Sequence, residues 1–319
     1  MRRHTIVAGV LSLSLAATLS ACGDPAGPTT AATGDAAAPQ TLTNCGQQYT
    51  YRQAPQRIVT SSTPATEMIL ALGQRDRLVG TVAPGELLPE YAGEMQGVQI
   101  IAEKAFPPPS KETVLAARPE LVVSAYSDDY GPKALGDRAK LAEEGVNSYL
   151  LSGACAGHKA SVDDTYTDLK NLGDLLGAPE KAEELVTKLR GEIDAVKPVA
   201  GNPTVFVYSG GKEKPTTPGA QALVDDLLRR AGASNAFPET TGFGQVNWEE
   251  LVKRDPDAIL IEDQAFEPAD AAITFLSGYP PIQGVTAVKE KRFIVVPVND
   301  NQPGLRSGRA LRTIVAGLG

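Results

Sequence analysis

The sequence predicts an α/β protein with two Rossmann-like lobes, each with a mainly parallel sheet, joined by one long helix with a ligand cleft between the lobes. Short runs of Ile, Val and Leu alternate with helical periodicity along the 319-residue chain, as in parallel sheets covered by helices. The order of these elements in the first half is repeated in the second. A single long two-sided helix separates the halves.

The joining helix is predicted at residues 179–198. Pro179 suits a first helical turn and Pro198 marks the end. One face is charged and the other is apolar, with Ala182, Leu185, Val186, Leu189, Ile193 and Val196 at helical spacing. We expect this helix to act as a strut that holds the cleft open to a nearly fixed width.

The first lobe is predicted at residues 43–178. Its strands are expected at 57–60, 78–82, 121–124 and 149–151, where β-branched and apolar residues cluster. Its helices are expected at 63–72, 110–117, 133–144 and 162–176, with Thr63 as a capping residue and Gly177 as a stop.

The second lobe, at residues 199–319, begins with a strand at 204–208 and a helix at 221–230. The segments that start at Ser110 and Asn247 repeat each other most clearly. Each has a capping residue, a glutamate two positions on, a proline nine positions on, then an acid and a strand. The lobes therefore share one architecture.

The N-terminus predicts export. Residues 1–21 read as a signal peptide, with Arg2 and Arg3 before an apolar run, and the small residues before Cys22 resemble a bacterial lipobox whose cysteine carries lipid. The alternative is an ordinary cleavage site with Cys22 incidental. Residues 22–42, rich in Ala, Gly, Pro and Thr, are predicted to be a flexible tether.

Cysteine and histidine counts limit the chemistry. Without Cys22, an even pair remains, Cys45 and Cys155, which in an exported chain predicts a disulfide; two unrelated buried thiols are the alternative. The only histidines are His4 and His158, so no two-histidine metal site can be built and we predict no metal site and no resident cofactor.

The net charge of −8 gives no electrostatic footprint for nucleic acid, so we predict no nucleic-acid partner and membrane contact only through the lipid anchor. Motifs of nucleophilic enzymes are also missing from the sequence. There is no Gly-x-Ser-x-Gly, and Gly210-Gly-Lys-Glu-Lys lacks the spacing of a P-loop. We predict that the chain is not an enzyme.

Several segments in order resemble one family. They are Pro55-Gln-Arg-Ile-Val, Ala65-Thr-Glu-Met-Ile-Leu-Ala-Leu-Gly, Arg118-Pro-Glu-Leu-Val-Val, Arg230-Ala-Gly-Ala-Ser-Asn-Ala-Phe and Asp255-Pro-Asp-Ala-Ile-Leu. With the lipobox and the interlobe helix, they resemble the substrate-binding lipoproteins of iron-siderophore and cobalamin ABC importers. This resemblance covers residues 42–319. It implies a monomeric receptor on the outer face of the cell membrane that works with a permease and a separate ATPase.

The resemblance also implies that each lobe presents an exposed acid to arginines of the permease. Glu67 matches the first position, and Asp226, with Asp225 beside it, falls at the second. Carboxylates and guanidinium groups form directional pairs that fix orientation.

Ligand contacts are expected from loops that follow strands, because ligands of parallel sheets bind beyond the carboxyl ends of the strands. Arg306 is the strongest single candidate, since its segment resembles a cleft segment in relatives, and Trp248 could instead anchor a core. The candidates are Ser62, Tyr126, Tyr130, Tyr208, Lys212, Gln245, Trp248, Asn301 and Arg306.

The leading ligand class is a ferric siderophore, because a chelate whose iron is fully ligated needs no metal ligand from the protein. Cobalamin, haem and a precursor of the deazaflavin F420 are alternatives for the same receptor. A surface scaffold or adhesion module without a small ligand is a different class of alternative, and it predicts a filled seam between the lobes.

Overall fold

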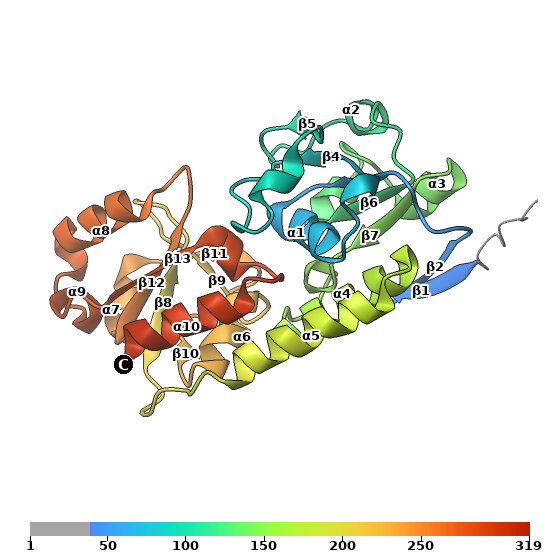
Figure 1. Cartoon of the computed structure of the whole chain (residues 1–319). Coiled ribbons are helices and arrows are strands. Elements are labelled where there is room, and N and C mark those ends of the chain that lie inside the picture. The colour runs from blue at the N-terminus through green and yellow to red at the C-terminus, as the bar shows by residue number, and fades with distance from the viewer. Residues whose placement is uncertain (1–38) are drawn as a thin grey trace, which may run out of the picture. The chain divides into compact units, whose positions relative to one another are not determined.

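The computed structural model describes residues 39–319 (Figure 1). The predicted signal peptide, Cys22 and most of the predicted tether lie outside this part of the chain. Within the described residues, no helix is both long enough and apolar enough to cross a membrane.

A five-stranded parallel sheet forms the first lobe, with strand order β5-β4-β3-β6-β7. The central residues Ile58, Val59 and Leu121 are fully buried, so both sheet faces are covered, which explains the uninterrupted apolar runs. The strands are β3 (Ile58–Thr60), β4 (Leu78–Val82), β5 (Gln99–Ala102), β6 (Leu121–Ser124) and β7 (Asn147–Leu150). The helices are α1 (Thr63–Ala71), α2 (Lys111–Leu115), α3 (Arg138–Glu143) and α4 (Val162–Leu176).

The second lobe repeats this plan with a four-stranded parallel sheet in the order β10-β8-β12-β13. Its strands are β8 (Thr204–Tyr208), β10 (Ser234–Asn235), β12 (Ala258–Asp263) and β13 (Phe293–Pro297). Its helices are α6 (Leu223–Arg230), α7 (Trp248–Arg254), α8 (Ala269–Gly278), α9 (Thr286–Lys289) and α10 (Ser307–Leu318). A small antiparallel pair, β9 (Thr216–Pro218) and β11 (Phe243–Gln245), is added to it.

The joining helix is α5 (Pro179–Asp194), and its predicted apolar face is confirmed. Ala182, Val186, Leu189 and Ile193 are buried in a hydrophobic cluster that contains residues of both lobes. Helix α5 runs alongside α4 (Figure 1), where a Cβ atom on Gly173 would lie 2.4 Å from the Cβ of Ala182. Glycine at this position therefore permits the close approach of the two helices.

An antiparallel hairpin that the sequence reading missed precedes the first lobe. It consists of β1 (Gln40–Asn44) and β2 (Gln47–Tyr51). The predicted tether extended to residue 42, and this boundary was wrong because residues 40–42 pair with β2. The signal was weak because the hairpin is made largely of Gln, Thr and Asn with few apolar side chains.

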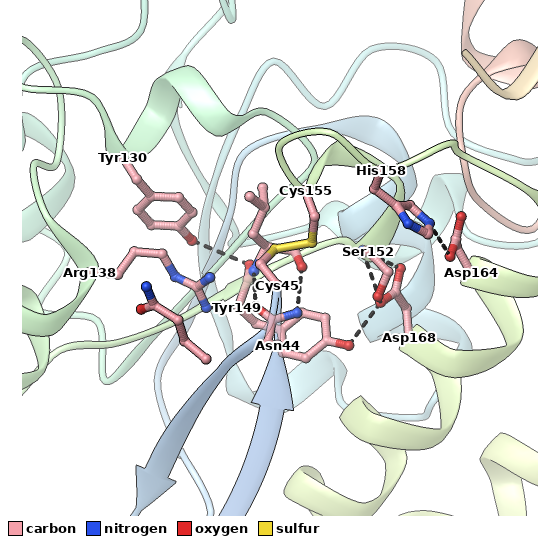
Figure 2. Close-up of a disulfide and its surroundings, with 12 residues drawn as sticks. Asn44, Cys45, Tyr130, Arg138, Tyr149, Ser152, Cys155, His158, Asp164 and Asp168 are labelled. Atoms are coloured by element: carbon pink, nitrogen blue, oxygen red, sulfur yellow. Dashed lines mark hydrogen bonds and ion pairs between the residues drawn. A yellow bond between two sulfur atoms is a disulfide. The ribbon is translucent and has the colours of Figure 1, made fainter. Parts of the chain in front are cut away.

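The predicted disulfide is present and ties this hairpin to the first lobe (Figure 2). Cys45 lies at the turn of the hairpin, and its sulfur is bonded to that of Cys155. Beside it, the amide of Asn44 donates to the carbonyl oxygen of Leu150 at 2.8 Å and its oxygen accepts from Arg138 at 2.6 Å. Asn44 thus extends the hydrogen bonding of β7.

A buried carboxyl group, that of Asp168 on α4, lies next to the disulfide (Figure 2). It accepts hydrogen bonds from the hydroxyl of Tyr149 at 2.8 Å and that of Ser152 at 2.6 Å. Burial raises the pKa of Asp168 to about 7, although these hydroxyl groups oppose the rise. The loop that contains Cys155 is therefore held to α4 by polar contacts as well as to the hairpin by the disulfide.

Two helix starts differ from the prediction. The helix expected from residue 133 begins only at Arg138, because Gly136 has a φ of 83° and Asp137 accepts hydrogen bonds from the amides of Ala139 and Lys140. Helix α1 is capped by Ser62 rather than by Thr63.

Candidate functional site

The carboxyl edges of the two sheets meet at one surface, which we call the seam. Because all strands in each sheet are parallel, the residues that follow them lie along one edge. Tyr126 follows β6, and Gln302 follows η6 (Val298–Asn301), the short turn after β13. The amide of Gln302 donates to the hydroxyl of Tyr126 at 3.4 Å, which joins the lobes across the seam.

A buried ion pair joins the two lobes. Arg306, at the start of α10, donates through Nε to Glu67 Oε2 at 2.9 Å and through Nη2 to Glu67 Oε1 at 2.5 Å. Glu67 on α1 is fully buried and Arg306 is 6% exposed. The same guanidinium donates to the carbonyl oxygen of Glu86, and the amide of Leu88 donates to Glu67. Each charge is thus paired and further hydrogen-bonded.

A second ion pair balances the charge around Arg306. Asp300, on η6, is buried and accepts from Arg306 Nη1 at 3.4 Å and from both Nε and Nη2 of Arg309 at 2.5 Å. Two carboxylates and two guanidinium groups therefore form one cluster with formal charges that cancel. Arg306 is therefore engaged through all three guanidinium nitrogens, whereas Arg309 is engaged on one side and its side chain is 44% exposed.

The expectation that Glu67 and Asp226 are exposed at the lobe tips is wrong. Glu67 is buried in an ion pair with Arg306, and Asp226 on α6 is 4% exposed. Asp226 accepts from Arg229 and Arg230, both at 2.8 Å, and from the backbone amide of Val162 at 2.9 Å. It links α6 of the second lobe to the start of α4 in the first, so both acids serve contacts between the lobes.

Two exposed glutamates occupy equivalent places in the lobes instead. Glu112 is the second residue of α2 and Glu249 is the second residue of α7, and each helix leads into a central strand, β6 or β12. A hydrogen bond from its own backbone amide, and then the hydroxyl of Ser110, lower the pKa of Glu112. These glutamates belong to the repeated segments that begin at Ser110 and Asn247.

The first lobe presents a buried carboxyl group at its carboxyl edge. The hydroxyl groups of Ser61, after β3, and Ser124, at the end of β6, both donate to Asp129 Oδ2 at 2.5 Å. Burial raises the pKa of Asp129, and the two hydroxyl groups oppose that rise. Asp129 and Tyr126 lie in the same loop after β6, where the amide of Asp129 donates to the carbonyl oxygen of Tyr126 at 3.3 Å.

The predicted ligand residues fall into three groups. Tyr126, Asn301 and Arg306 lie at the seam or next to a residue that bridges it. Lys212 and Gln245 are exposed on the second lobe. The others serve the interior of one lobe, namely Ser62, Tyr130, Tyr208 and Trp248.

The interior positions have identifiable local roles. Ser62 accepts from the amide of Ala65 as a helix cap, and the hydroxyl of Tyr130 donates to the carbonyl oxygen of Val122. Tyr208 is fully buried against Trp248, whose indole NH donates to the carbonyl oxygen of Lys212 at 3.0 Å. Of the two roles considered for Trp248, the structure shows the core anchor.

Two exposed phenylalanines near the seam escaped the sequence reading. Phe106, in the segment after β5, is 53% exposed and packs edge-on against Tyr126 with ring centroids 5.0 Å apart. Phe266 follows β12 and is 78% exposed. A large apolar residue in a loop after a strand is the sequence pattern that could have identified them. Strand β5 was not predicted, so the sequence did not place Phe106 in a loop at the edge of the sheet.

The expected open cleft is bridged at the seam by the contacts of Tyr126 with Gln302 and of Glu67 with Arg306. A hollow of about 200 Å³ touches both lobes on the α5 side. It is lined by residues that include Tyr91, Leu189, Leu305, Arg309 and Arg312. Within residues 39–319, no group of three or more His, Cys, Asp or Glu side chains is placed to hold a metal ion.

Comparison with known proteins decides the family. The sequence model of the family described as periplasmic binding protein matches residues 58–299, which covers both sheets. The chain belongs to this family. The recognition made from its motifs is thereby confirmed.

Sequence relatives and solved structures agree with this membership. The chain is 26% identical over 261 residues to an uncharacterized ABC transporter substrate-binding lipoprotein, YvrC, of Bacillus subtilis, covering 79% of this chain and 78% of the relative. It is 26% identical over 219 residues to a vitamin B12-binding protein of Pectobacterium carotovorum, covering 65% and 71%. These relatives are named as binding and transport proteins, in agreement with the prediction that the chain is no enzyme.

The fold is that of solved periplasmic binding proteins. One from Veillonella parvula has a TM-score of 0.77 at 25% identity and covers 88% of this chain and 97% of its own. A structure titled ABC-type Fe3+-hydroxamate transport system from Saccharomonospora viridis has a TM-score of 0.75 at 24% identity, covering 88% and 99%. The α/β prediction with parallel sheets is confirmed.

In this periplasmic binding protein, replacing Glu67 by Gln should lower the free energy of unfolding by about 3 to 5 kcal/mol, because the buried guanidinium of Arg306 loses its main counter-charge. Chemical denaturation monitored by circular dichroism measures this change.

The matched control is Glu184→Gln, which breaks the exposed pair of Glu184 with Lys181 and should cost less than about 1 kcal/mol. Equal effects of the two substitutions would contradict a special role for the buried pair.

Proposed function

We propose that the protein is the extracytoplasmic substrate-binding protein of an ABC importer, held at the membrane by lipid on Cys22. The observation that carries this proposal is the meeting of two parallel-sheet edges at the seam, in a chain that belongs to the periplasmic binding proteins. The lipid is inferred from the small residues before Cys22 and from the YvrC relative, which is named a lipoprotein. The stretch after Cys22, which is rich in Ala, Gly, Pro and Thr, would let the lobes lie at some distance from the membrane surface.

The ligand we propose is a preassembled metal chelate, with ferric siderophores as the leading class. A chelate with a fully ligated metal suits a chain whose only histidines are His4 and His158. The exposed rings of Phe106 and Phe266 and the half-buried ring of Tyr126 offer apolar surface to such a ligand.

Cobalamin is the second candidate, and a specific observation favours it. The Pectobacterium relative is named a vitamin B12-binding protein, and its alignment covers more than half of each of the two chains. A phosphorylated F420 precursor is less favoured, because Arg306 is buried in ion pairs with Glu67 and Asp300 and only the exposed side of Arg309 remains for a phosphate.

The leaderless protein should bind one of these classes with submicromolar affinity. Ligand at a hundred times its dissociation constant should then stabilise the fold by about 2.7 kcal/mol and raise the melting temperature. Equilibrium dialysis and thermal unfolding against ferrioxamine B, ferric enterobactin, cyanocobalamin, haem and F420 measure both effects. If none of these ligands binds or stabilises the protein, the scaffold alternative is favoured over the receptor function.

The anchor has its own test. Replacing Cys22 by Ala should release the exported protein from the membrane fraction, because the lipid-bearing thiol is lost. Cell fractionation with immunoblotting measures the shift, and Cys45→Ala, which leaves the lipobox intact, serves as the control. Retention of the Cys22 variant in the membrane would argue against lipidation.

The permease contact is better served by Glu112 and Glu249 than by the buried Glu67 and Asp226. Both are exposed, and the repeated architecture gives them equivalent positions in the two lobes. Two acids related in this way suit a permease with two arginine sites.

Charge reversal tests this contact. Glu112→Lys with Glu249→Lys should reduce importer-dependent ligand uptake at least about tenfold through repulsion, while ligand affinity in solution stays unchanged. Glu180→Lys, at an exposed site on α5, is the control. Full uptake by the double variant would remove both glutamates from the docking surface.

A further inference from the structure

Three polar side chains gather at the carboxyl edge of the second sheet. Ser209 follows β8, Glu262 is the penultimate residue of β12, and Asn301 ends η6 after β13. These three strands are neighbours, with β12 in the middle. The amide nitrogen of Asn301 donates to Glu262 Oε1 at 2.6 Å. We call Ser209, Glu262 and Asn301 the acceptor cluster.

The acceptor cluster is buried, and within the described part of the chain one oxygen atom of each of its three members lacks a partner with the distance and angle of a hydrogen bond. Glu262 is 3% exposed, and Ser209 and Asn301 are each 8% exposed. Among residues 39–319, Glu262 Oε2, Asn301 Oδ1 and Ser209 Oγ have no hydrogen-bond partner. Burial raises the pKa of Glu262, and the nearby Ser209 hydroxyl and Asn301 amide oppose the rise. Unused buried polar atoms lower stability, so a fold that keeps three together requires an explanation.

The seam supplies that explanation. Gln302, next to Asn301, contacts Tyr126 of the first lobe, and its own side-chain oxygen also lacks a partner among the described residues. Phe106 packs on Tyr126, and Phe266 follows β12 only a few residues after Glu262. The unused oxygens and the exposed aromatic rings therefore both follow strands of parallel sheets, at the edge where ligands of such sheets bind.

The chemistry of the cluster selects the ligand group. The unused atoms of Glu262 and Asn301 are a carboxyl and a carbonyl oxygen, and the Ser209 hydroxyl can also accept. Such a set pairs with N–H donors and repels ligand carboxylates and phosphates. The guanidinium of Arg306 does not offset this preference, because Glu67 and Asp300 already engage it, and that of Arg309 is turned toward Asp300 through Nε and Nη2.

We infer that the acceptor cluster is a ligand subsite that binds N–H groups, namely a carboxamide or an ammonium group carried by an otherwise apolar chelate. This inference rests on the proposed receptor function and narrows its substrate class. It favours corrinoids with peripheral carboxamides and siderophores with a free amine over polyanionic chelates.

Matched probe pairs test the subsite. Cyanocobalamin, which bears carboxamides, is compared with its carboxylic acid derivative, and ferrioxamine B, which bears an ammonium group, with its N-succinyl derivative. Calorimetry on the leaderless protein should show the carboxamide or ammonium member binding at least about tenfold more tightly than its acidic partner.

Two variants assign that preference to the cluster. Glu262→Gln keeps an oxygen for Asn301 and places an amide where the free acceptor was, so it should weaken binding of the preferred probe about tenfold. Ser209→Ala removes the hydroxyl that faces Glu262, so its affinity for the preferred probe should fall, and its melting temperature without ligand shows separately what the fold itself loses. Asp168→Asn, the same type of change at a buried carboxyl group in the first lobe, is the control and should leave affinity unchanged.

The outcomes separate the two proposals. If the wild-type protein binds a probe but both variants bind it equally well, the subsite is overturned and the receptor function stands. Preference for the acidic members would also overturn the subsite. If the wild-type protein binds no probe of either pair, the chelate receptor function fails and the subsite fails with it.

Discussion

The buried pair of Arg306 and Glu67 is the interaction on which the meeting of the two lobes depends. A charge can be buried in an apolar core only if it is paired and hydrogen-bonded. Each member of this pair belongs to a different lobe, so neither lobe satisfies the condition alone. The pair fixes the position of α10 against α1 and, through Glu86 and Leu88, the loop between β4 and β5. The unused oxygens of the acceptor cluster lie at the same seam.

Much of the fold could be predicted, because buried parallel strands and two-sided helices leave strong periodic patterns. The run from Leu121 to Ser124 and the apolar face of α5 are examples. Elements at the margins left weaker patterns. Strand β5 is an edge strand with Gln99 and Ile100 exposed, and the β1–β2 hairpin is mostly polar, so neither resembles a core strand.

The site was harder to predict than the fold because its contacts join residues that are far apart in sequence. Glu67 stands among apolar neighbours on α1, but its partner lies 239 residues away, and periodicity cannot identify such a partner. The same limit applies to Tyr126 and Gln302. Residue type alone also placed Tyr208 among the ligand residues and left two roles open for Trp248, since aromatic side chains with polar groups suit a ligand surface and a core equally well.

The long separation between Glu67 and Arg306 also affects how the protein is made. A chain made from its N-terminus delivers α1 early and α10 last. Until Arg306 arrives, the carboxylate of Glu67 has no counter-charge to enter the core with, so the first lobe cannot reach its final packing. Folding of both lobes is thereby coupled to the arrival of the last helix.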